Sequence, residues 1–364
     1  MAMISFQPAF RNKNVFITGH TGFKGSWLAI WLNAIGAKVC GYALPPPKTA
    51  NNFRLSKVAD CLTKHIEADI RDYRRLKKCL RDAQPDFIFH LAAQPLVRES
   101  YRAPLDTFEI NVGGTVNLLE AVRELKRPCA VIVVTSDKCY ENTGKNRGYR
   151  EDDSMGGHDP YSASKGAAEI VTAAYLRSFF PAENIGRHGI KLASARSGNV
   201  IGGGDWAPDR IIPDCISALT RHKPIPVRNP AAIRPWQHVL EPLSGYLLLA
   251  ARLSSSSAGK YCGAWNFGPA GKSMHPVKDL VEETIRWWGK GAWQDMSDKN
   301  APHEAALLTL SSKKAKQLLG WQNTWNFSQA VEKTILWYMA WHDKKTGIGK
   351  LCLKQIEEYC RDAQ

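Results

Sequence analysis

The stretch "NVFITGHTGFKG", residues 14–25, joins a short apolar run to three glycines that stand three residues apart. The run "NVFIT" is typical of a buried strand, and the following "SWLAIWLNAIGA" has helical spacing. Glycines at such a strand-to-helix turn let the backbone approach a pyrophosphate, which rests on the helix N-terminus. The pattern, GxxGxxG and not GxGxxG, predicts a dinucleotide site whose cofactor-binding residues are Gly19, Gly22, Phe23 and Gly25.

Strands and helices alternate through the rest of the first half of the chain. Further apolar runs read "KVCGYAL" from residue 38, "FIFHLAA" from 87, "CAVIVVTS" from 129 and "GIKLASARSGNV" from 189. Because these runs are apolar along their length and alternate with helical patterns, they predict a parallel sheet covered on both faces. The predicted fold class is α/β, with a doubly wound, Rossmann-type parallel sheet.

The alternation stops near residue 200. The following segments, such as "RHKPIPVRNPAAIRPWQHV", are rich in Gly, Pro and aromatic residues, and amphipathic helices such as "PVKDLVEETIRWWG" come after them. This change predicts a smaller, mixed C-terminal substrate lobe. We expect a dinucleotide-binding domain at 8–196 with a returning helix near 240–254, and a substrate-binding lobe at 197–235 and 260–350.

Composition narrows the classes of function. The chain has 364 residues, 23% of them charged, and a formal net charge of +15, with no recognition helix or RNA-stacking motif. Its nine cysteines show no CxxC or CxxH spacing, which favours free thiols in a reducing, cytoplasmic location. No apolar run reaches the roughly 18 residues of a membrane span, and no HExxH pattern suggests a metal. We expect no nucleic acid, membrane or metal partner.

The end of the second predicted strand lacks an expected group. Dinucleotide-binding folds place an acidic residue there, on the adenosine ribose hydroxyls, but "CGYALPPPK" contains no carboxylate. The sequence therefore leaves NAD and NADP open and predicts weak cofactor retention. Asp69, with Ile70, follows the third strand and could bind the adenine amine; equally, Asp69 could cap a helix.

Tyr161 and Lys165 in "DPYSASKGAAE" lie four residues apart, so on a helix they share a face. A tyrosine with a pKa near 10 is a poor base at neutral pH, but a neighbouring ammonium would lower that pKa. The pair predicts a base that takes a proton from a sugar hydroxyl while hydride leaves the same carbon.

Several motifs resemble one known group of enzymes. "HLAAQ" at 90–94, Asn111, "YSASK" and "ARSGNVIGGGD" resemble the nucleotide-sugar group of the extended short-chain dehydrogenases/reductases. Within it, "TGHTGFKGSW", "TSDKCY", "GNVIGGGDW" and "IRPWQHVLEPLSGY" are similar to the CDP-glucose 4,6-dehydratases. The resemblance implies NAD as cofactor, with Ala92, Ala93, Gln94 and Asn111 among its binding residues.

The same resemblance implies an activity. CDP-D-glucose would become CDP-4-keto-6-deoxy-D-glucose and water, by an intramolecular hydride shift from C4 to C6 through bound NAD. Such a lyase serves deoxysugar biosynthesis of the lipopolysaccharide or O-antigen type. The resemblance also implies a homodimer or homotetramer, built on the helices that begin near Pro104 and Tyr161.

Catalytic roles can be carried onto "TSDKCY" residue by residue. Tyr161 would remove the proton of the 4-hydroxyl, and Ser136, or less favourably Thr135, would hydrogen-bond that hydroxyl. Asp137 would protonate the departing 6-hydroxyl. Lys138 stands where many related dehydratases have a glutamate that removes the C5 proton, so we expect it to act as that base; alternatively, it merely pairs with Asp137 or a sugar oxygen.

Substrate binding is expected downstream of the catalytic segment. Asn199 matches the family's diphosphate contact, and Arg210 and Arg234 are candidate phosphate clamps, because a guanidinium matches phosphate bidentately. Trp206 and Trp236 belong either to the core or to the base pocket. His90 and His238 are expected in the core or behind the site, and a segment around His303 and Glu304 resembles a substrate-side segment only weakly.

Two other readings remain open on these residues. A different nucleotide-sugar 4,6-dehydratase would share the Asp-Lys pair, whereas an epimerase would have no use for it. A non-catalytic dinucleotide-binding regulator would have no reason to keep Tyr161, Lys165 and Asp137 together.

Overall fold

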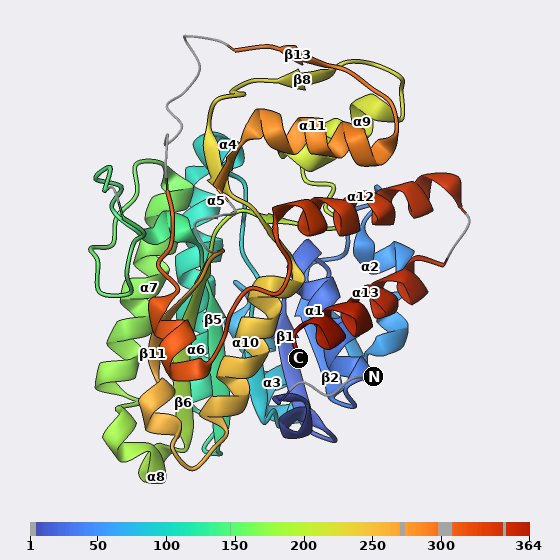
Figure 1. Cartoon of the computed structure of the whole chain (residues 1–364). Coiled ribbons are helices and arrows are strands. Elements are labelled where there is room, and N and C mark those ends of the chain that lie inside the picture. The colour runs from blue at the N-terminus through green and yellow to red at the C-terminus, as the bar shows by residue number, and fades with distance from the viewer. Residues whose placement is uncertain (1–4, 146, 270–273, 298–307, 345–346) are drawn as a thin grey trace.

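The computed structural model describes residues 5–145, 147–269, 274–297, 308–344 and 347–364. Its centre is a seven-stranded sheet of order β11-β6-β5-β4-β1-β2-β3, in which every pair of neighbours is parallel (Figure 1). The strands are β1 (Asn14–Thr18), β2 (Lys38–Ala43), β3 (Lys64–Glu67), β4 (Phe87–His90), β5 (Cys129–Val134), β6 (Ile190–Ser197) and β11 (Gly263–Phe267). The predicted doubly wound α/β class is confirmed.

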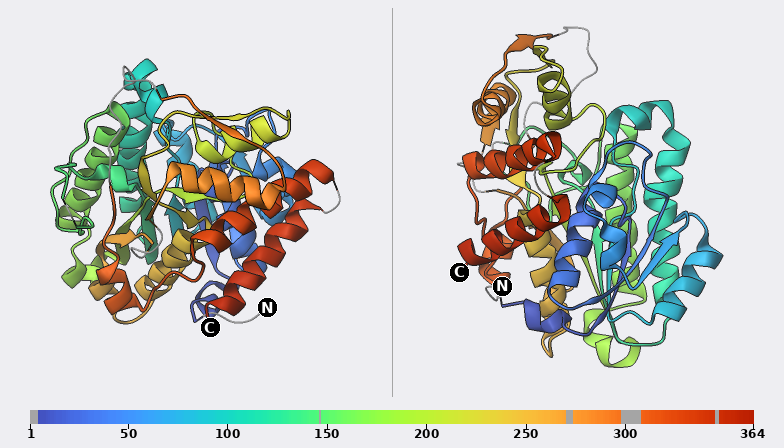
Figure 2. Two further views of the ribbon diagram at one scale, coloured as in Figure 1. Left: turned by 45° about the horizontal axis from the view of Figure 1, so that its top comes forward. Right: turned by 90° about the vertical axis from the view of Figure 1, so that its right-hand side faces the viewer.

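Helices cover both faces of this sheet, because successive strand residues point to opposite sides. Val15 and Ile17 of β1 belong to one apolar core with the helices α1, α10, α12 and α13, whereas Phe16 belongs to the other with α3, α6 and α7. Figure 2 shows the C-terminal helices on the side of the molecule opposite α6 and α7. The bounds of these helices are α1 (Phe23–Ala34), α3 (Tyr73–Ala83), α6 (Gly114–Arg123), α7 (Pro160–Ser178), α10 (Leu240–Leu253), α12 (Phe327–Asp343) and α13 (Ile348–Asp362).

A second, smaller assembly lies beyond the carboxyl ends of the strands (Figure 1). It has its own apolar cluster, which includes Cys215, Leu219, Ile225 and Val281. The strands and α-helices of this part of the chain, apart from α10 and β11, are β7 (Val200–Ile201), β8 (Ile225–Val227), β9 (Ile233–Pro235), β10 (Gln237–His238), β12 (Met274–Pro276), β13 (Trp293–Asp295), α9 (Ile211–Leu219) and α11 (Val277–Trp288). The remaining short helices are α2 (Asn52–Leu55), α4 (Val97–Arg102), α5 (Pro104–Phe108) and α8 (Ile185–His188).

One predicted boundary needs correction. Residues 260–350 were expected in the lobe, but Gly263–Phe267 form β11, which pairs with β6 at the edge of the main sheet. Trp265 and Phe267 are fully buried against the core of that sheet, which holds the strand there. The helix expected near 240–254 is present as α10, whereas the division of the chain into two domains stays a prediction.

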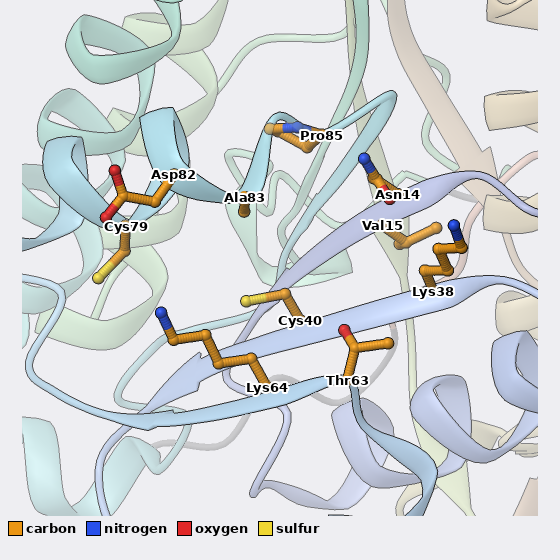
Figure 3. A pocket seen from close by; sticks show the side chains of 10 residues that line it. All are labelled: Asn14, Val15, Lys38, Cys40, Thr63, Lys64, Cys79, Asp82, Ala83 and Pro85. Carbon is orange, nitrogen blue, oxygen red and sulfur yellow. The ribbon is translucent and has the colours of Figure 1, made fainter.

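The sheet has a hollow at each end. At the amino ends of β1, β2 and β3 there is a small one of about 250 Å3, lined in part by Cys40, Lys64 and Cys79 (Figure 3). The carboxyl ends face a much larger cavity of about 1020 Å3. In open α/β sheets ligands bind at the carboxyl ends, so the larger cavity is the candidate site.

Three further features bear on the predicted partners. All nine cysteines are free. None of the helices in the described ranges combines the length and apolar character that a bilayer-spanning segment needs. Within the same ranges, no cluster of three His, Cys, Asp or Glu side chains is arranged to hold a metal ion.

Candidate active site

The cavity brings together residues that lie far apart in the sequence. Of the residues predicted to bind or react, all but Gln94 and Asn111 line it: Gly19, Gly22, Phe23, Gly25, Asp69, Ile70, Ala92, Ala93, Ser136, Asp137, Lys138, Tyr161, Lys165, Asn199, Arg210 and Arg234. The glycine turn and the two catalytic segments therefore share one space.

The glycine turn between β1 and α1 is packed too tightly for side chains. Gly19 has a φ of +76°, and a Cβ there would lie 2.6 Å from the backbone nitrogen of Ala92. A Cβ on Gly25 would lie 2.2 Å from the carbonyl oxygen of Gly19. Gly22 begins α1 without a side-chain cap, so the first N–H groups of this helix are available to an anion. The turn fits a dinucleotide pyrophosphate.

The part of the cavity next to the end of β2 is lined without a carboxylate from that strand. The residues there are Tyr42, Ala43 and Leu44. Asp69 lines the same part, but its carboxylate pairs with Arg71 at 2.8 Å. The helix-cap alternative for Asp69 is wrong, because Asp72 caps α3 by accepting from the backbone N–H of Arg75.

Gln94 and Asn111 stand behind the wall of the cavity. The Asn111 side chain accepts from the backbone N–H of Gln94 at 2.8 Å and donates to Ser164 Oγ at 2.8 Å. Gln94 Nε2 donates to Thr107 Oγ1 at 2.9 Å. These hydrogen bonds make the two residues supports of the 91–96 loop and of α7. Their predicted part in cofactor binding stays a prediction.

Tyr161 and Lys165 lie in the first turns of α7, which Asp159 caps by accepting from the backbone N–H of Ser162 at 2.9 Å. Both side chains are buried. Burial raises the pKa of Tyr161 to about 12, opposed by a hydrogen bond with Ser136 and by the charge of Arg210. The lowering of this pKa expected from Lys165 stays a prediction, and burial outweighs the groups that oppose it. Burial lowers the pKa of Lys165 to about 8, although the charge of Glu169 raises it.

The segment after β5 holds the candidate acid. Asp137 is buried in a short 3-10 turn, Asp137–Cys139, and Ser136 Oγ donates to its Oδ1 at 2.9 Å. Burial raises the pKa of Asp137, opposed chiefly by the charge of Lys138. A raised pKa favours the protonated carboxyl group, which is the form that can donate a proton. Thr135 instead donates its hydroxyl to Glu169, which leaves Ser136 as the hydroxyl beside Tyr161.

The predicted substrate residues also line the cavity. Arg210 Nη1 bonds Asp205 Oδ2 at 2.6 Å, so this guanidinium is already partly engaged. Arg234 follows directly on Ile233 in β9, and Asn199 precedes β7. His303 and Glu304 lie outside the described residues.

Four aromatic side chains had open assignments. Trp206 and Trp236 both line the cavity, Trp206 packed against Trp341 at 4.5 Å between ring centroids. His90 bonds Thr18 Oγ1 at 2.7 Å in the core. His238 is fully buried beside a tryptophan ring. The two histidines are core residues, as predicted.

Sequence reasoning missed several charged groups of this site. Lys24 lines the cavity from the glycine turn and donates to Ser197 Oγ at 2.7 Å. Burial, with the charge of Arg210, lowers the pKa of Lys24 to about 7. The signal for Lys24 was a charge in the first turn of a helix that faces the cofactor. Glu169, four residues after Lys165, could have been found from the same helical spacing that paired Lys165 with Tyr161.

Comparison with known proteins identifies relatives. The family model described as GDP-mannose 4,6 dehydratase matches residues 16–334. The chain is 47% identical over 332 residues to the CDP-glucose 4,6-dehydratase of Salmonella typhimurium, which covers 91% of this chain and 92% of that protein. A probable dTDP-glucose 4,6-dehydratase of Sinorhizobium fredii is 26% identical, covering 89% and 92% of the two chains.

Solved structures share the fold. The dTDP-glucose 4,6-dehydratase DesIV of Streptomyces venezuelae, solved with NAD, superposes with a TM-score of 0.75 at 22% identity, over 92% of this chain and 99% of that one. A UDP-glucose 4-epimerase of Stenotrophomonas maltophila, also with NAD, gives 0.77 at 20% identity, over 92% and 100%. The chain therefore belongs to the GDP-mannose 4,6 dehydratase family, within the extended short-chain dehydrogenases/reductases.

Proposed function

We propose that this protein is an NAD-dependent CDP-glucose 4,6-dehydratase, which converts CDP-D-glucose to CDP-4-keto-6-deoxy-D-glucose and water. The observation that carries the proposal is the convergence of Tyr161, Lys165, Asp137 and Lys138 with a glycine turn in one cavity. The nucleotide of the substrate is taken from the relative that is 47% identical. We place the reaction in deoxysugar biosynthesis of the lipopolysaccharide type.

The residues of the glycine turn fit NAD. Gly19, Gly22 and Gly25 would hold its pyrophosphate at the N-terminus of α1, and Ala92 and Ala93 would flank it. Asp69 and Ile70 would lie at the adenine. When bound, NAD supplies the acceptor and then the donor of the hydride that moves from C4 to C6.

The chain's own groups would handle the protons of the first step. The Tyr161 phenol would take the proton of the 4-hydroxyl, with Ser136 as its hydrogen-bond partner. Because burial raises the pKa of Tyr161 to about 12, the positive charges of Arg210 and of the occupied site would have to favour the phenolate. Lys165 would supply a further positive charge on the same helix face.

The elimination of water would use the neighbouring acid and amine. Once C4 is a ketone, the C5 proton becomes acidic, and Lys138, acting as the neutral amine, would accept it and become the ammonium. Asp137, with its raised pKa, would give its proton to the departing 6-hydroxyl. Asn199, Arg210 and Arg234 would hold the diphosphate at the other side of the cavity.

The test is turnover of CDP-, UDP- and dTDP-glucose by the purified protein with NAD, followed by the absorbance of the 4-keto sugar in alkali. Deuterium placed at C4 should appear at C6 of the product. Tyr161→Phe should lower kcat by about two to four orders of magnitude. Turnover of UDP- or dTDP-glucose without CDP-glucose would overturn the substrate, and loss of the label to solvent would overturn the mechanism.

The oligomeric state of the protein is also part of the proposal. Leu105 on α5 and Ile170 on α7 are 71% and 56% exposed, and Tyr101 on α4 lies in the same group of helices. An apolar surface of this kind favours a homodimer through these helices, or a homotetramer built on it. Leu105→Glu should shift the mass measured by light scattering towards the monomer; an unchanged mass would exclude this face. The free cysteines favour a cytoplasmic location.

A further inference from the structure

Behind the candidate active site lies a buried network of charged and hydroxyl groups that the proposed chemistry does not use. Its centre is Glu169 of α7, which is 3% exposed. The Glu169 carboxylate accepts from Ser194 Oγ of β6 at 2.7 Å and pairs with Arg196 Nη2 at 2.7 Å. Its other oxygen accepts from the hydroxyl of Thr135.

Two partners of Glu169, Thr135 and Arg196, connect it to the two ends of the segment Ser136–Lys138. Thr135 immediately precedes the segment Ser136–Lys138 at the end of β5. Arg196 Nη1 bonds the hydroxyl of Tyr140, which follows that segment, at 2.5 Å, and the carbonyl oxygen of Glu151 at 3.1 Å. One carboxylate on α7 therefore fastens the residues on both sides of the candidate acid and base.

Glu169 also stands on the helix face that carries the reactive pair. It lies one turn beyond Lys165 and two turns beyond Tyr161, so the three side chains share a stripe of α7. The charge of Glu169 raises the pKa of Lys165, against the lowering caused by burial. The other groups facing Lys165 are Cys139 from the 3-10 turn, His90 from β4 and Lys24 from α1.

We propose that Glu169 is a positioning residue for the dehydratase reaction, which keeps Lys165 in its ammonium form and fixes α7 against the Ser136–Lys138 segment. It is not among the residues that line the cavity, and it acts through Lys165 and Thr135, which do line it. A buried ion pair is by itself weak support for stability. The placement of this one, between the two halves of the catalytic apparatus, gives it a function in aligning them. The proposal rests on the proposed function.

The sign of the expected pH effect follows from the charges. Removing the anion at Glu169 takes away the group that raises the pKa of Lys165, so Lys165 should lose its proton at lower pH. Loss of a nearby opposite charge typically shifts the pKa of a buried group by about one unit or more. The high-pH limb of the plot of kcat against pH should shift to lower pH by that amount. KM for the nucleotide sugar should stay near the wild-type value.

The experiment compares three variants with the wild type, using kcat and KM on CDP-glucose from pH 6 to 10 together with urea unfolding. Glu169→Gln keeps shape but removes charge, and should lower kcat about tenfold or more with the alkaline limb displaced. Thr135→Val removes one hydrogen bond and no charge, and should lower kcat without moving the limb. Ser194→Ala removes a hydrogen bond to the same carboxylate from a residue that does not line the cavity. It should leave kcat and the position of the alkaline limb unchanged.

The proposal would be overturned if the alkaline limb of Glu169→Gln lay at the same pH as that of the wild type. It would also be overturned if Ser194→Ala displaced the limb as far as Glu169→Gln does. If Glu169→Gln is too unstable to assay, the double variant with Arg196→Met, which removes both buried charges, should show the same displaced limb. A wild-type protein inactive on CDP-glucose but active on another nucleotide sugar would refute the proposed substrate, and the same comparison would then be made on that sugar.

Discussion

Two buried carboxylates flank the Tyr161–Lys165 pair, and they have opposite character. Asp137 and Glu169 are 4% and 3% exposed, so burial disfavours both anions to a similar degree. Burial raises the pKa of Asp137 despite its positive neighbours. Glu169 keeps a pKa below its usual value in spite of burial, because Arg196 pairs with it and two hydroxyls donate to it.

The difference shows that partners, and not depth, decide what a buried acid does. Asp137 receives one hydroxyl and no guanidinium within hydrogen-bond range among the described residues, so it can hold a transferable proton. Glu169 receives a guanidinium and two hydroxyls, so it is a fixed negative charge. The site therefore separates a proton donor, which follows β5, from a structural anion on α7.

The largest expected effect is the loss of activity when Asp137, the proposed proton donor, is replaced. Asp137→Asn keeps the size of the side chain but cannot donate the proton to the leaving hydroxyl, so kcat should fall by about two to four orders of magnitude. Since the folded pKa of Asp137 is raised, its contribution to stability is present at low pH and is lost as pH rises. The variant should therefore gain stability relative to the wild type as pH increases, in urea unfolding. A variant that loses stability at high pH would contradict the raised pKa.

The second prediction removes the guanidinium partner of Glu169, so that its carboxylate, like that of Asp137, has no guanidinium beside it. Arg196→Met leaves the carboxylate buried without its partner and should cost about 3–5 kcal/mol of unfolding free energy. Adding Glu169→Gln removes the stranded charge and should recover much of that loss. Chemical denaturation of the single and double variants measures both values. Equal stabilities of the two would show that the ion pair does not hold Glu169 ionised.

A third buried carboxylate, outside the active site, tests whether partners decide the protonation of a buried acid. Glu241 of α10 is buried, accepts from the backbone N–H of Trp325 at 2.8 Å and from Tyr359 Oη at 2.9 Å, and has a pKa raised by burial to about 7. Its contribution to stability is present below its unfolded pKa, near 4.5, and is lost as pH rises through about 7. Glu241→Gln should remove this dependence, so the melting-temperature difference between variant and wild type should change between pH 5 and pH 8. A constant difference would refute the raised pKa.

The smallest effect is expected at an exposed ion pair. Arg71 pairs with Asp69 at 2.8 Å, with side chains 39% and 28% exposed. Water screens such pairs, so Arg71→Ala should change the unfolding free energy by less than about 1 kcal/mol. A loss of unfolding free energy as large as that of Arg196→Met would mean that burial does not explain the difference in strength between the two ion pairs. The same variant frees Asp69, so a tighter NAD affinity in fluorescence quenching would support the adenine role of Asp69.

Much of the site was predictable because its signals are local. Gly19, Gly22 and Gly25 stand at a strand-to-helix turn that only small residues fit, and Tyr161 and Lys165 are separated by one helical turn. Gln94 and Asn111 were assigned to cofactor binding by resemblance alone. Their hydrogen bonds to each other and to Ser164 and Thr107 depend on the packing of segments up to 53 residues apart.

The sequence by itself determined the parallel α/β order, the dinucleotide turn and the shared face of the reactive pair, since each follows from spacing within one or two neighbouring elements. Only the tertiary structure decided the place of β11 in the main sheet, the entry of Lys24 into the cavity and the contrast between Asp137 and Glu169. The physical reason is that protonation depends on burial and on partners such as Arg196, which chain folding brings from distant segments. Spacing records which residues share a helix face, whereas desolvation and ion pairing are properties of the assembled interior.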